Sequence, residues 1–342
     1  MKLLVITQKV DRNDQLLGFF VNWLNRLSDK FERMTVLCLE KGDFSLSDNV
    51  TVISLGKERH LPKLAWLFNF YRFIFQLRKD YDAVLVHMNP IWMVLGGICW
   101  RLMGKKNYLW YTSGGVTFKL KLAEKFTHTV LTASPESFRV FSQKVVITGH
   151  GIDTDLFKPA ANPQEKDGKL KILSVGRIAP VKNYEILIEA AKILRERGFD
   201  FGVNMIGEAP TGKDRIYERK VKNSIKNLKL ESYFVFLGKI NIQKLPFYYQ
   251  THDLFVHLSK TGSLDKSLLE AMASGIRVLS SNDWSRRHLP PELVFGENDP
   301  IELADKIENI FRTDFRKKLR DLVIAGHNLD NLIEKISAVI KK

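Results

Sequence analysis

The feature that most constrains this fold is the regular alternation of short, continuously apolar runs with segments of helical spacing. Runs such as residues 3–7 and 83–87 lack polar alternation, which is typical of strands buried on both faces. The segment 19–27, between two such runs, has its apolar residues at helical spacing. Strands that alternate with helices in this way form a parallel sheet covered by helices on both faces. The sequence therefore predicts an α/β fold.

The alternation occurs twice, on either side of a linker. Predicted strands of the first series are residues 3–7, 34–39, 50–55, 83–87, 108–111, 129–133 and 145–148, with helices at 19–27, 63–78 and 92–102. Residues 159–169 are rich in Pro, Asn, Gln, Lys and Gly and interrupt the pattern. Strands of the second series are residues 171–175, 201–206, 233–237, 254–257 and 277–280, with helices at 184–195, 216–227, 245–249, 266–273, 301–312, 316–325 and 329–340.

A chain of 342 residues is too long for one ordinary core and fits two domains. We predict two Rossmann-like parallel-sheet domains facing a cleft, at residues 1–160 and 161–342, with the last helix crossing back to the first domain. Open α/β sheets bind ligands at the carboxyl ends of their strands. We therefore expect the functional residues in the loops that follow the strands.

Cysteines and apolar stretches indicate the compartment. Cys38 and Cys99 lie far apart in apolar runs without histidines at metal-ligand spacing, so we expect buried thiols in a reducing compartment, with no metal site. The amino-terminal apolar run is too short for a signal peptide, and the longest one, 91–100, is too short to span a bilayer. We expect a cytoplasmic protein, either free or peripheral on the inner face of the membrane.

The net charge of +15 is unevenly distributed, because residues 51–150 contain 14 Lys and Arg but only 5 Asp and Glu. Such a surplus attracts acidic lipid, pyrophosphate groups and nucleic acid alike. The predicted helix 63–78 interleaves aromatic residues with cations, which suits either core packing or an anionic membrane surface, and the surplus favours the membrane. Since the chain has no recognised nucleic-acid reader motif, we expect no specific nucleic-acid partner.

Two segments of the second series carry residues suited to phosphate chemistry. Segment 176–183 (Gly-Arg-Ile-Ala-Pro-Val-Lys-Asn) follows a strand and opens a helix. Gly176 is a candidate donor-binding residue, and Arg177 and Lys182 would clamp a diphosphate beside the helix start, where backbone N–H groups already favour anions. The alternative is a solvated basic turn.

The second segment, 259–275, contains a small-residue loop and another helix start. Its loop and first helical turn present backbone N–H groups to phosphate. Glu270, one turn into the helix, can accept hydrogen bonds from both hydroxyls of a ribose, although it can also be an ordinary surface glutamate. The candidate donor-binding residues of this segment are Gly262, Ser263, Leu264, Asp265, Lys266 and Glu270.

Taken with Phe-Leu-Gly at 236–238 and His-Gly-Ile-Asp-Thr-Asp-Leu-Phe at 150–157, these segments resemble the group-one (family 4 type) retaining glycosyltransferases of GT-B architecture. The resemblance implies that Arg177 and Lys182 neutralise the departing diphosphate without a divalent metal, and that Glu270 holds the ribose. It also implies that Gly238 and Lys239 contact the base. The donor would be a UDP- or GDP-sugar, with no cofactor, and the acceptor a glycan, a lipid-linked sugar or a phospholipid.

Two positions depart from the family's pattern. The first of the family's two glutamates, which contacts the transferred sugar, is replaced here by Gly262. Either Asp265 supplies a nearby carboxylate instead, or Lys266 adds a third cation to the phosphate site. Many relatives have a histidine facing the sugar where this chain has Ser113, so Ser113 and Gly114 would contact the sugar or the acceptor. His87, which ends the preceding strand, would face the cleft instead as a catalytic residue, or be structural. Both losses keep a second hypothesis open: a catalytically inactive GT-B scaffold that binds a nucleotide sugar or a partner enzyme.

The amino-terminal loop, residues 15–20, corresponds to the family's glycine loop. Gly18 would allow the backbone to approach the donor closely, unless it merely begins a helix.

Overall fold

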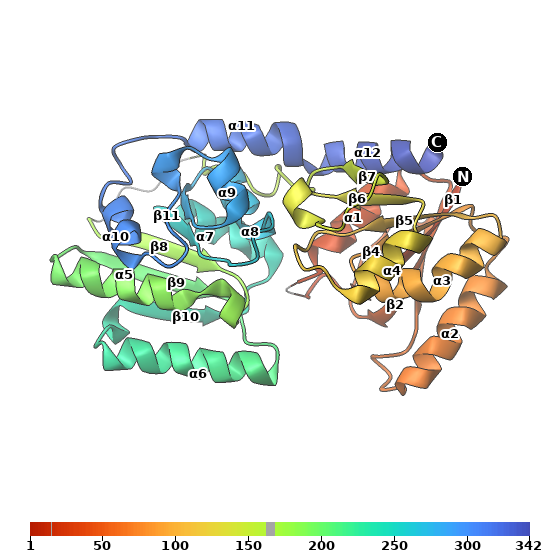
Figure 1. Ribbon diagram of the computed structural model, residues 1–342, viewed down its shortest axis with the longest axis horizontal. Coiled ribbons are helices and arrows are strands. Elements are labelled where there is room, and N and C mark those ends of the chain that lie inside the picture. Colours follow the sequence, from red (N-terminus) through yellow and green to blue (C-terminus); the bar gives the residue numbers. More distant parts are fainter. Residues whose placement is uncertain (15, 162–167) are drawn as a thin grey trace. The chain divides into compact units, whose positions relative to one another are not determined.

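The computed structural model describes residues 1–14, 16–161 and 168–342, which form two compact units (Figure 1). Unit 1 comprises residues 1–151 and 327–342, and unit 2 comprises residues 152–326. This division comes earlier than residue 160 because Ile152 and Phe157 already belong to the core of unit 2. Of the expected linker 159–169, residues 162–167 lie outside the described residues.

Unit 1 is built on a seven-stranded parallel sheet in the order β3-β2-β1-β4-β5-β6-β7. The strands are β1 (Lys2–Val10), β2 (Arg33–Lys41), β3 (Val50–Ser54), β4 (Ala83–His87), β5 (Lys106–Trp110), β6 (Thr129–Thr132) and β7 (Val145–Ile147). Its helices are α1 (Phe19–Ser28), α2 (Lys63–Gln76), α3 (Pro90–Leu102), α4 (Phe118–Phe126), the 3-10 turn η1 (Pro135–Ser137) and α12 (Leu329–Lys341).

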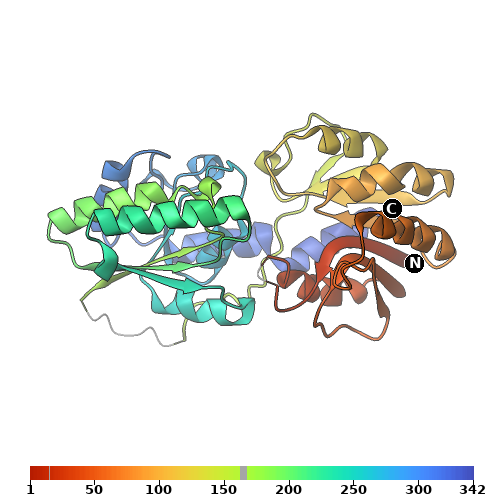
Figure 2. The same ribbon diagram turned by 90° about the horizontal axis from the view of Figure 1, so that it is seen from below.

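Helices cover both faces of the unit 1 sheet. One face packs against α1 and α12, which lie side by side (Figure 2), and the other against α2, α3 and α4. Strand side chains such as Leu3 and Leu4 are therefore fully buried on opposite faces. This burial explains why the strands read as continuous apolar runs.

Unit 2 is built on a five-stranded parallel sheet in the order β10-β9-β8-β11-β12. The strands are β8 (Leu170–Val175), β9 (Phe201–Ile206), β10 (Phe234–Gly238), β11 (Leu254–His257) and β12 (Arg277–Ser280). Its helices are α5 (Tyr184–Glu196), α6 (Gly212–Asn227), α7 (Leu245–Thr251), α8 (Lys266–Ala273), α9 (Asp283–His288), α10 (Pro300–Glu308) and α11 (Arg316–His327), with 3-10 turns η2 (Pro180–Lys182), η3 (Glu231–Tyr233), η4 (Ile242–Lys244) and η5 (Pro291–Leu293).

Both sheets reverse their strand order once. In unit 1 the reversal lies between β1 and β4, and in unit 2 between β8 and β11. A ligand crevice of an open parallel sheet forms outside the carboxyl ends of the strands at this point. The predicted α/β fold of two parallel-sheet domains is confirmed. In unit 2 the two predicted phosphate-binding segments follow the strands on either side of the reversal, β8 and β11.

Three further observations concern the cysteines, membrane spans and metal ligands. Cys38 is buried, Cys99 is partly buried, and both are free thiols; burial raises the pKa of Cys38 to about 12. Within residues 1–14, 16–161 and 168–342, no helix is long and apolar enough to cross a membrane. Within the same ranges, no three His, Cys, Asp or Glu side chains are grouped to hold a metal ion.

Candidate functional site

The ends of β8 and β11 bring the two predicted phosphate segments to one edge of the unit 2 sheet. Strand β8 pairs with β11 in parallel, so the loops that follow Val175 and His257 leave the sheet side by side. The first loop contains Arg177 and η2, and the second leads into α8. The structure therefore brings together the residues that the sequence singles out around 176–182 and 259–270.

Lys182 folds back over the end of β8. Its Nζ lies 2.6 Å from Oδ2 of Asp265. A Cβ atom placed on Gly176 would lie 3.0 Å from Cε of Lys182, and Gly176 has a φ of +156°. A side chain at position 176 would therefore displace the lysine, so the glycine keeps the ammonium group close to the sheet edge.

Asp265 has a second partner in His257, whose Nε2 lies 2.8 Å from the same Oδ2. Burial acts to raise the pKa of Asp265, but Lys182 and His257 outweigh it and hold that pKa well below its ordinary value. Burial lowers the pKa of His257, although Asp265 acts in the opposite direction. At neutral pH we therefore describe Asp265 as a carboxylate and His257 as a neutral imidazole. The Asp265 carboxylate thus holds the Lys182 ammonium group.

Glu270 is buried, with 4% of its surface exposed. One carboxylate oxygen accepts a hydrogen bond from the Tyr249 hydroxyl at 3.3 Å, and the other forms an ion pair with Lys266. Burial raises the pKa of Tyr249 well above its ordinary value, and Glu270 adds to this effect, so Tyr249 remains a donor. Lys266 is thus engaged by Glu270, one turn further along α8.

Glycines line the ends of three neighbouring strands of unit 2. Gly176, Gly207 and Gly238 follow or end β8, β9 and β10, and all three have positive φ. A Cβ on Gly207 would lie 1.9 Å from the Gly176 carbonyl oxygen, and the Gly207 N–H donates to the Gly238 carbonyl at 2.9 Å. Sequence reasoning missed Gly207, although it follows an apolar strand as Gly176 does. Gly207 is buried and the Gly176 carbonyl fills the place of its side chain, so the close packing of these strand ends requires glycine there.

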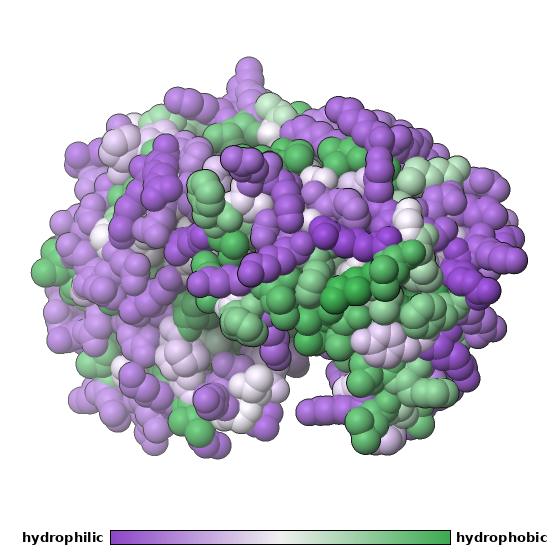
Figure 3. All heavy atoms as spheres, turned by 45° about the vertical axis from the view of Figure 1, so that its right-hand side comes forward, coloured by the Kyte–Doolittle hydropathy of each residue, from purple (hydrophilic) through white to green (hydrophobic). Residues whose placement is uncertain are grey.

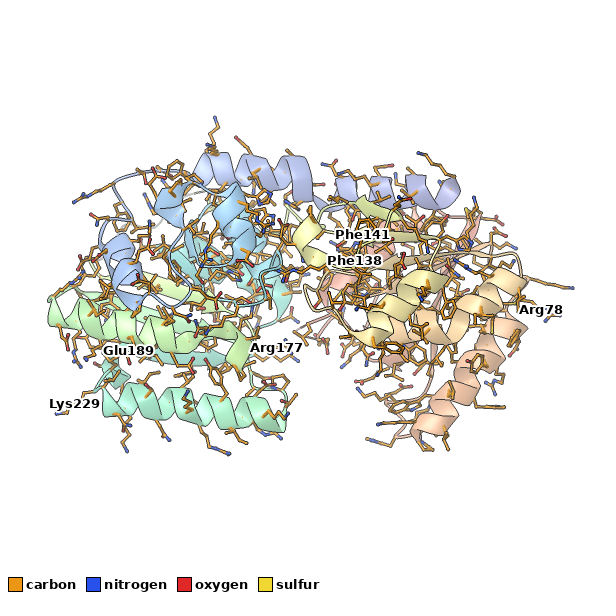
Figure 4. The ribbon with its side chains drawn as sticks, in the orientation of Figure 1. Arg78, Phe138, Phe141, Arg177, Glu189 and Lys229 are labelled. Carbon is orange, nitrogen blue, oxygen red and sulfur yellow. The ribbon has the colours of Figure 1, made fainter. Side chains whose placement is uncertain are left out.

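The remaining predicted residues of unit 2 divide into exposed and buried positions. Arg177 and Lys239 are exposed, and in Figure 4 Arg177 lies beside the start of α5 while Lys229 lies at the other end of the unit. Gly262 is buried with a φ of +65°. Ser263 and Leu264 point inward, since the Ser263 hydroxyl donates to Thr261 at 3.1 Å and Leu264 is 1% exposed. These two residues can offer a ligand their backbone rather than their side chains.

His87 lies in the interior of unit 1, with 1% of its surface exposed. Its ring stacks between those of Phe20, at 3.8 Å, and Trp110, at 5.2 Å, and Nδ1 lies 3.1 Å from the Thr7 hydroxyl. Burial lowers the pKa of His87 to about 3, with a smaller effect from His150. The expectation that His87 faces the cleft is therefore wrong, because the aromatic side chains of α1 and β5 cover it; its surroundings support the alternative of a structural histidine.

Gly18 is also accounted for by its own surroundings. A Cβ there would lie 2.5 Å from the Asp14 carbonyl oxygen and 2.8 Å from that of Arg12, so the loop before α1 requires glycine. Gln15, in the same predicted motif, lies outside the described residues. Ser113 and Gly114 follow β5 on the carboxyl edge of the unit 1 sheet, where both are partly exposed.

Several known proteins resemble this chain in sequence or in fold. The family model described as "Glycosyl transferases group 1" matches residues 158–328. The chain is 30% identical over 135 residues to mannosylfructose-phosphate synthase of Agrobacterium fabrum, covering 36% of this chain and 30% of that protein. It is 26% identical over 132 residues to alpha-monoglucosyldiacylglycerol synthase of Streptococcus pneumoniae, covering 38% and 28%. The chain thus matches less than a third of the length of either relative.

Solved structures show the same fold along the whole chain. Anabaena HepE, crystallised with UDP and glucose, superposes with a TM-score of 0.82 at 16% identity and covers 100% of both chains. Sucrose-phosphate synthase from Thermosynechococcus elongatus gives a TM-score of 0.79 at 17% identity and covers 100% of this chain and 98% of that one. Because the family model spans half of the chain, and the fold agrees, the protein belongs to the group 1 glycosyl transferases.

Proposed function

We propose that this protein transfers a sugar from a UDP-sugar, or from a GDP-sugar, to an acceptor, and that the donor diphosphate binds where β8 and β11 end. The observation that carries the proposal is the meeting of Lys182 with the start of α8 at the switch point of the sheet. Support comes from the family to which the chain belongs and from the Anabaena neighbour, whose crystals contain UDP and glucose.

The start of α8 is suited to bind phosphate oxygens. Asp265 occupies the N-cap position, but its side chain makes no capping hydrogen bond, so the first-turn N–H groups are not occupied by it. Such N–H groups and the helix dipole favour an anion. Arg177 is exposed on the neighbouring loop and would add a charge-assisted contact.

Catalysis would follow from the charge that develops as the donor breaks. When the bond from the sugar to the diphosphate is cleaved, negative charge grows on the departing phosphate oxygen. Fixed cations and N–H dipoles stabilise this charge more in the transition state than in the bound donor. We therefore propose a metal-independent reaction in which Arg177 and Lys182 take the role of the cation. Retention of configuration at the transferred carbon is part of the proposal and rests on the family resemblance.

The ribose and base would extend from α8 towards the end of β10. Glu270 would accept hydrogen bonds from the ribose once Lys266 moves from its carboxylate. The backbone of Gly238 and Lys239 would lie against the base, and a Cβ atom on Gly238 would meet nothing within 4 Å.

The sharpest test is a binding panel of nucleotide sugars, measured by thermal shift and calorimetry in EDTA and again in Mg²⁺. A donor that binds stabilises the protein by mass action, by about 2.7 kcal/mol at a hundredfold excess over Kd. We expect UDP and one UDP-sugar to bind equally well in EDTA and in Mg²⁺, and Arg177→Ala to weaken both. Failure of every UDP- and GDP-sugar to bind would refute the proposed function.

We further propose that the acceptor is met at an anionic membrane surface. The outer face of α2 exposes Leu64 at 80% and Phe68 at 67%, with Phe75 seven residues further along the same stripe. Figure 3 shows apolar side chains gathered on this side of unit 1. Exposed cations lie on α2, on the turn after it, and on α3 and α4, which cover the same face of the sheet: Lys63, Arg72, Arg78, Arg101, Lys119, Lys121 and Lys125. An apolar stripe bordered by cations fits a bilayer interface with acidic headgroups.

This surface suits a lipid-linked or phospholipid acceptor, and a glycan acceptor remains the alternative. The Streptococcus relative is named for the synthesis of a glycosylated diacylglycerol, which supports the lipid class.

A second candidate function is a scaffold that binds the donor without transferring its sugar. Position 262 carries no carboxylate, position 113 carries no histidine, and His87 is buried. Tight donor binding with neither hydrolysis nor transfer, restored only by a partner enzyme, would favour this candidate.

A further inference from the structure

Asp265 is an N-cap residue whose side chain does not cap its helix. Its backbone is extended, with φ −89° and ψ 137°, and aspartate is among the residues that cap best. In the same unit Asp299 caps α10 in the usual way, accepting a hydrogen bond from the Glu302 N–H. The carboxylate of Asp265 is instead held by His257 and Lys182, at 2.8 and 2.6 Å.

A chain of buried groups behind His257 fixes the direction of this contact. Because Asp265 is a carboxylate, it can only accept, so His257 must carry its proton on Nε2. In a neutral imidazole Nδ1 then accepts, and the Ser280 hydroxyl lies 3.0 Å from it. Ser280 in turn accepts from the Ser285 hydroxyl at 2.8 Å. His257 is 2% exposed, and both serines are fully buried.

We infer that Ser285, Ser280 and His257 form a positioning relay that turns the Asp265 carboxylate away from the N–H groups of α8 and onto Lys182. The inference deepens the proposed function and rests on it. The relay keeps the helix start open for the diphosphate, and it holds the Lys182 ammonium group beside that opening. None of its three members touches the donor, so all act through Asp265.

The relay removes a competitor from the site. Without the hydrogen bond from Nε2 of His257, the Asp265 carboxylate would turn back to the first-turn N–H groups of α8, which are the ordinary partners of an N-cap side chain. A negative charge would then occupy the place of the phosphate, and Lys182 would lose its anchor. The nucleotide sugar should therefore bind more weakly, whereas the rate at which the bound nucleotide sugar reacts should change less.

Four variants test the relay through the Kd for UDP, measured by calorimetry. His257→Leu removes the Nε2 donor, and we expect a Kd about tenfold higher, equivalent to about 1.4 kcal/mol. His257→Gln keeps an N–H close to the position of Nε2, and we expect its Kd to stay within about twofold of wild type. In the Asp265→Ala background, His257→Leu should have no further effect, because the relay then has nothing to position. Should His257→Leu not fold, Ser280→Ala takes its place, with an expected rise of a few fold.

His252→Leu is the matched control. His252 is a partly buried histidine of the same unit whose partners are Asn204 and the Tyr248 carbonyl, so its loss should lower stability and leave the Kd unchanged.

A readout independent of the donor is the ¹⁵N spectrum of His257, which should show a neutral ring protonated on Nε2 at pH 7. An equal Kd for His257→Leu and wild type, additive effects with Asp265→Ala, or a ring protonated on Nδ1 would each overturn the relay and leave the proposed function standing. A wild-type protein that binds no nucleotide would overturn both.

Discussion

At the scale of single residues, the structure explains how a glutamate in a mostly apolar helix can be held ready for a ligand. Glu270 has both carboxylate oxygens in use, one by Tyr249 and one by Lys266. These partners offset the cost of burying its charge. Tyr249 lies deep in the unit and is fixed, whereas Lys266 is a flexible side chain that can exchange with a ribose.

We predict that Tyr249→Phe weakens UDP binding about tenfold or more, because a hydrogen bond to a charged group contributes about 1.5–3 kcal/mol and Glu270 loses its fixed orientation. The neighbouring Tyr248→Phe is the control, since Tyr248 is only partly buried. Calorimetry with UDP compares the two. A Kd for Tyr249→Phe equal to that of Tyr248→Phe would show that Tyr249 does not act through Glu270.

His87 gives a prediction about pH rather than catalysis. Its folded pKa of about 3 lies below the ordinary 6.5, so the unfolded chain binds a proton that the folded unit 1 does not. Stability contributed by the neutral ring is therefore complete above about pH 6.5 and is lost as the pH falls toward 3. Denaturant unfolding followed by tryptophan fluorescence should show a midpoint that declines with acid. We expect the midpoint of His87→Phe, which preserves the stack between Phe20 and Trp110, to fall less steeply with decreasing pH. An equally steep fall in this variant would show that His87 is not the source of the acid sensitivity.

At the scale of elements, every strand could be predicted from the sequence, whereas two of the helices could not. Each of the twelve predicted strands is present, and β4, β9, β11 and β12 have the predicted limits, because a continuous apolar run marks a strand buried on both faces. Helices α4 and α9 were missed. α4 buries only Leu120 and Ala123, and α9 has six residues, so neither repeats its pattern often enough to be recognised. α6 begins earlier than the apolar spacing indicates because Thr211 and Asp214 form a capping box.

Site residues could be predicted only as far as the sequence pattern shows their tertiary surroundings. His87 and His257 both end a strand beside the point where the strand order reverses. His87 was the predicted site residue, yet His257 is the one that contacts Asp265. Both positions have the same sequence signal. What separates them is tertiary: aromatic rings of α1 and β5 cover His87, while the turn into α8 brings Asp265 back to His257.

Helix α2 carries the prediction about membranes. We expect the protein to bind vesicles that contain phosphatidylglycerol more strongly than vesicles of phosphatidylcholine, and Leu64→Ser with Phe68→Ser to weaken that binding at least tenfold. The two side chains contribute apolar surface worth about 1.5–3 kcal/mol each when fully buried. Ile216→Ser is the control, because Ile216 is also exposed on a basic helix, α6 of unit 2. Sedimentation of both variants with vesicles gives the comparison, and equal binding would exclude the α2 face.

At the scale of the whole molecule, the two units are compact bodies with separate cores, and the chain passes between them twice. The second passage brings α12 onto α1, where Leu332 and Ile336 are fully buried and Arg26 pairs with Asp330 at 2.9 Å. The carboxyl-terminal residues thus belong to the core of the unit formed by the amino-terminal residues. Damage to α12 should therefore appear as a loss of stability in unit 1.

Tryptophan fluorescence can distinguish the units, because five of the six tryptophans lie in unit 1 and only Trp284 lies in unit 2. We predict that Ile336→Ala lowers the stability of the transition reported by fluorescence by about 2–5 kcal/mol, the usual cost of truncating a buried isoleucine. Val323→Ala in α11, whose side chain is fully buried in unit 2, should leave that transition in place and shift a second one, followed by circular dichroism. If both substitutions moved the same transition by similar amounts, the two cores would unfold as one, and the assignment of α12 to unit 1 alone would no longer describe how this chain holds its fold.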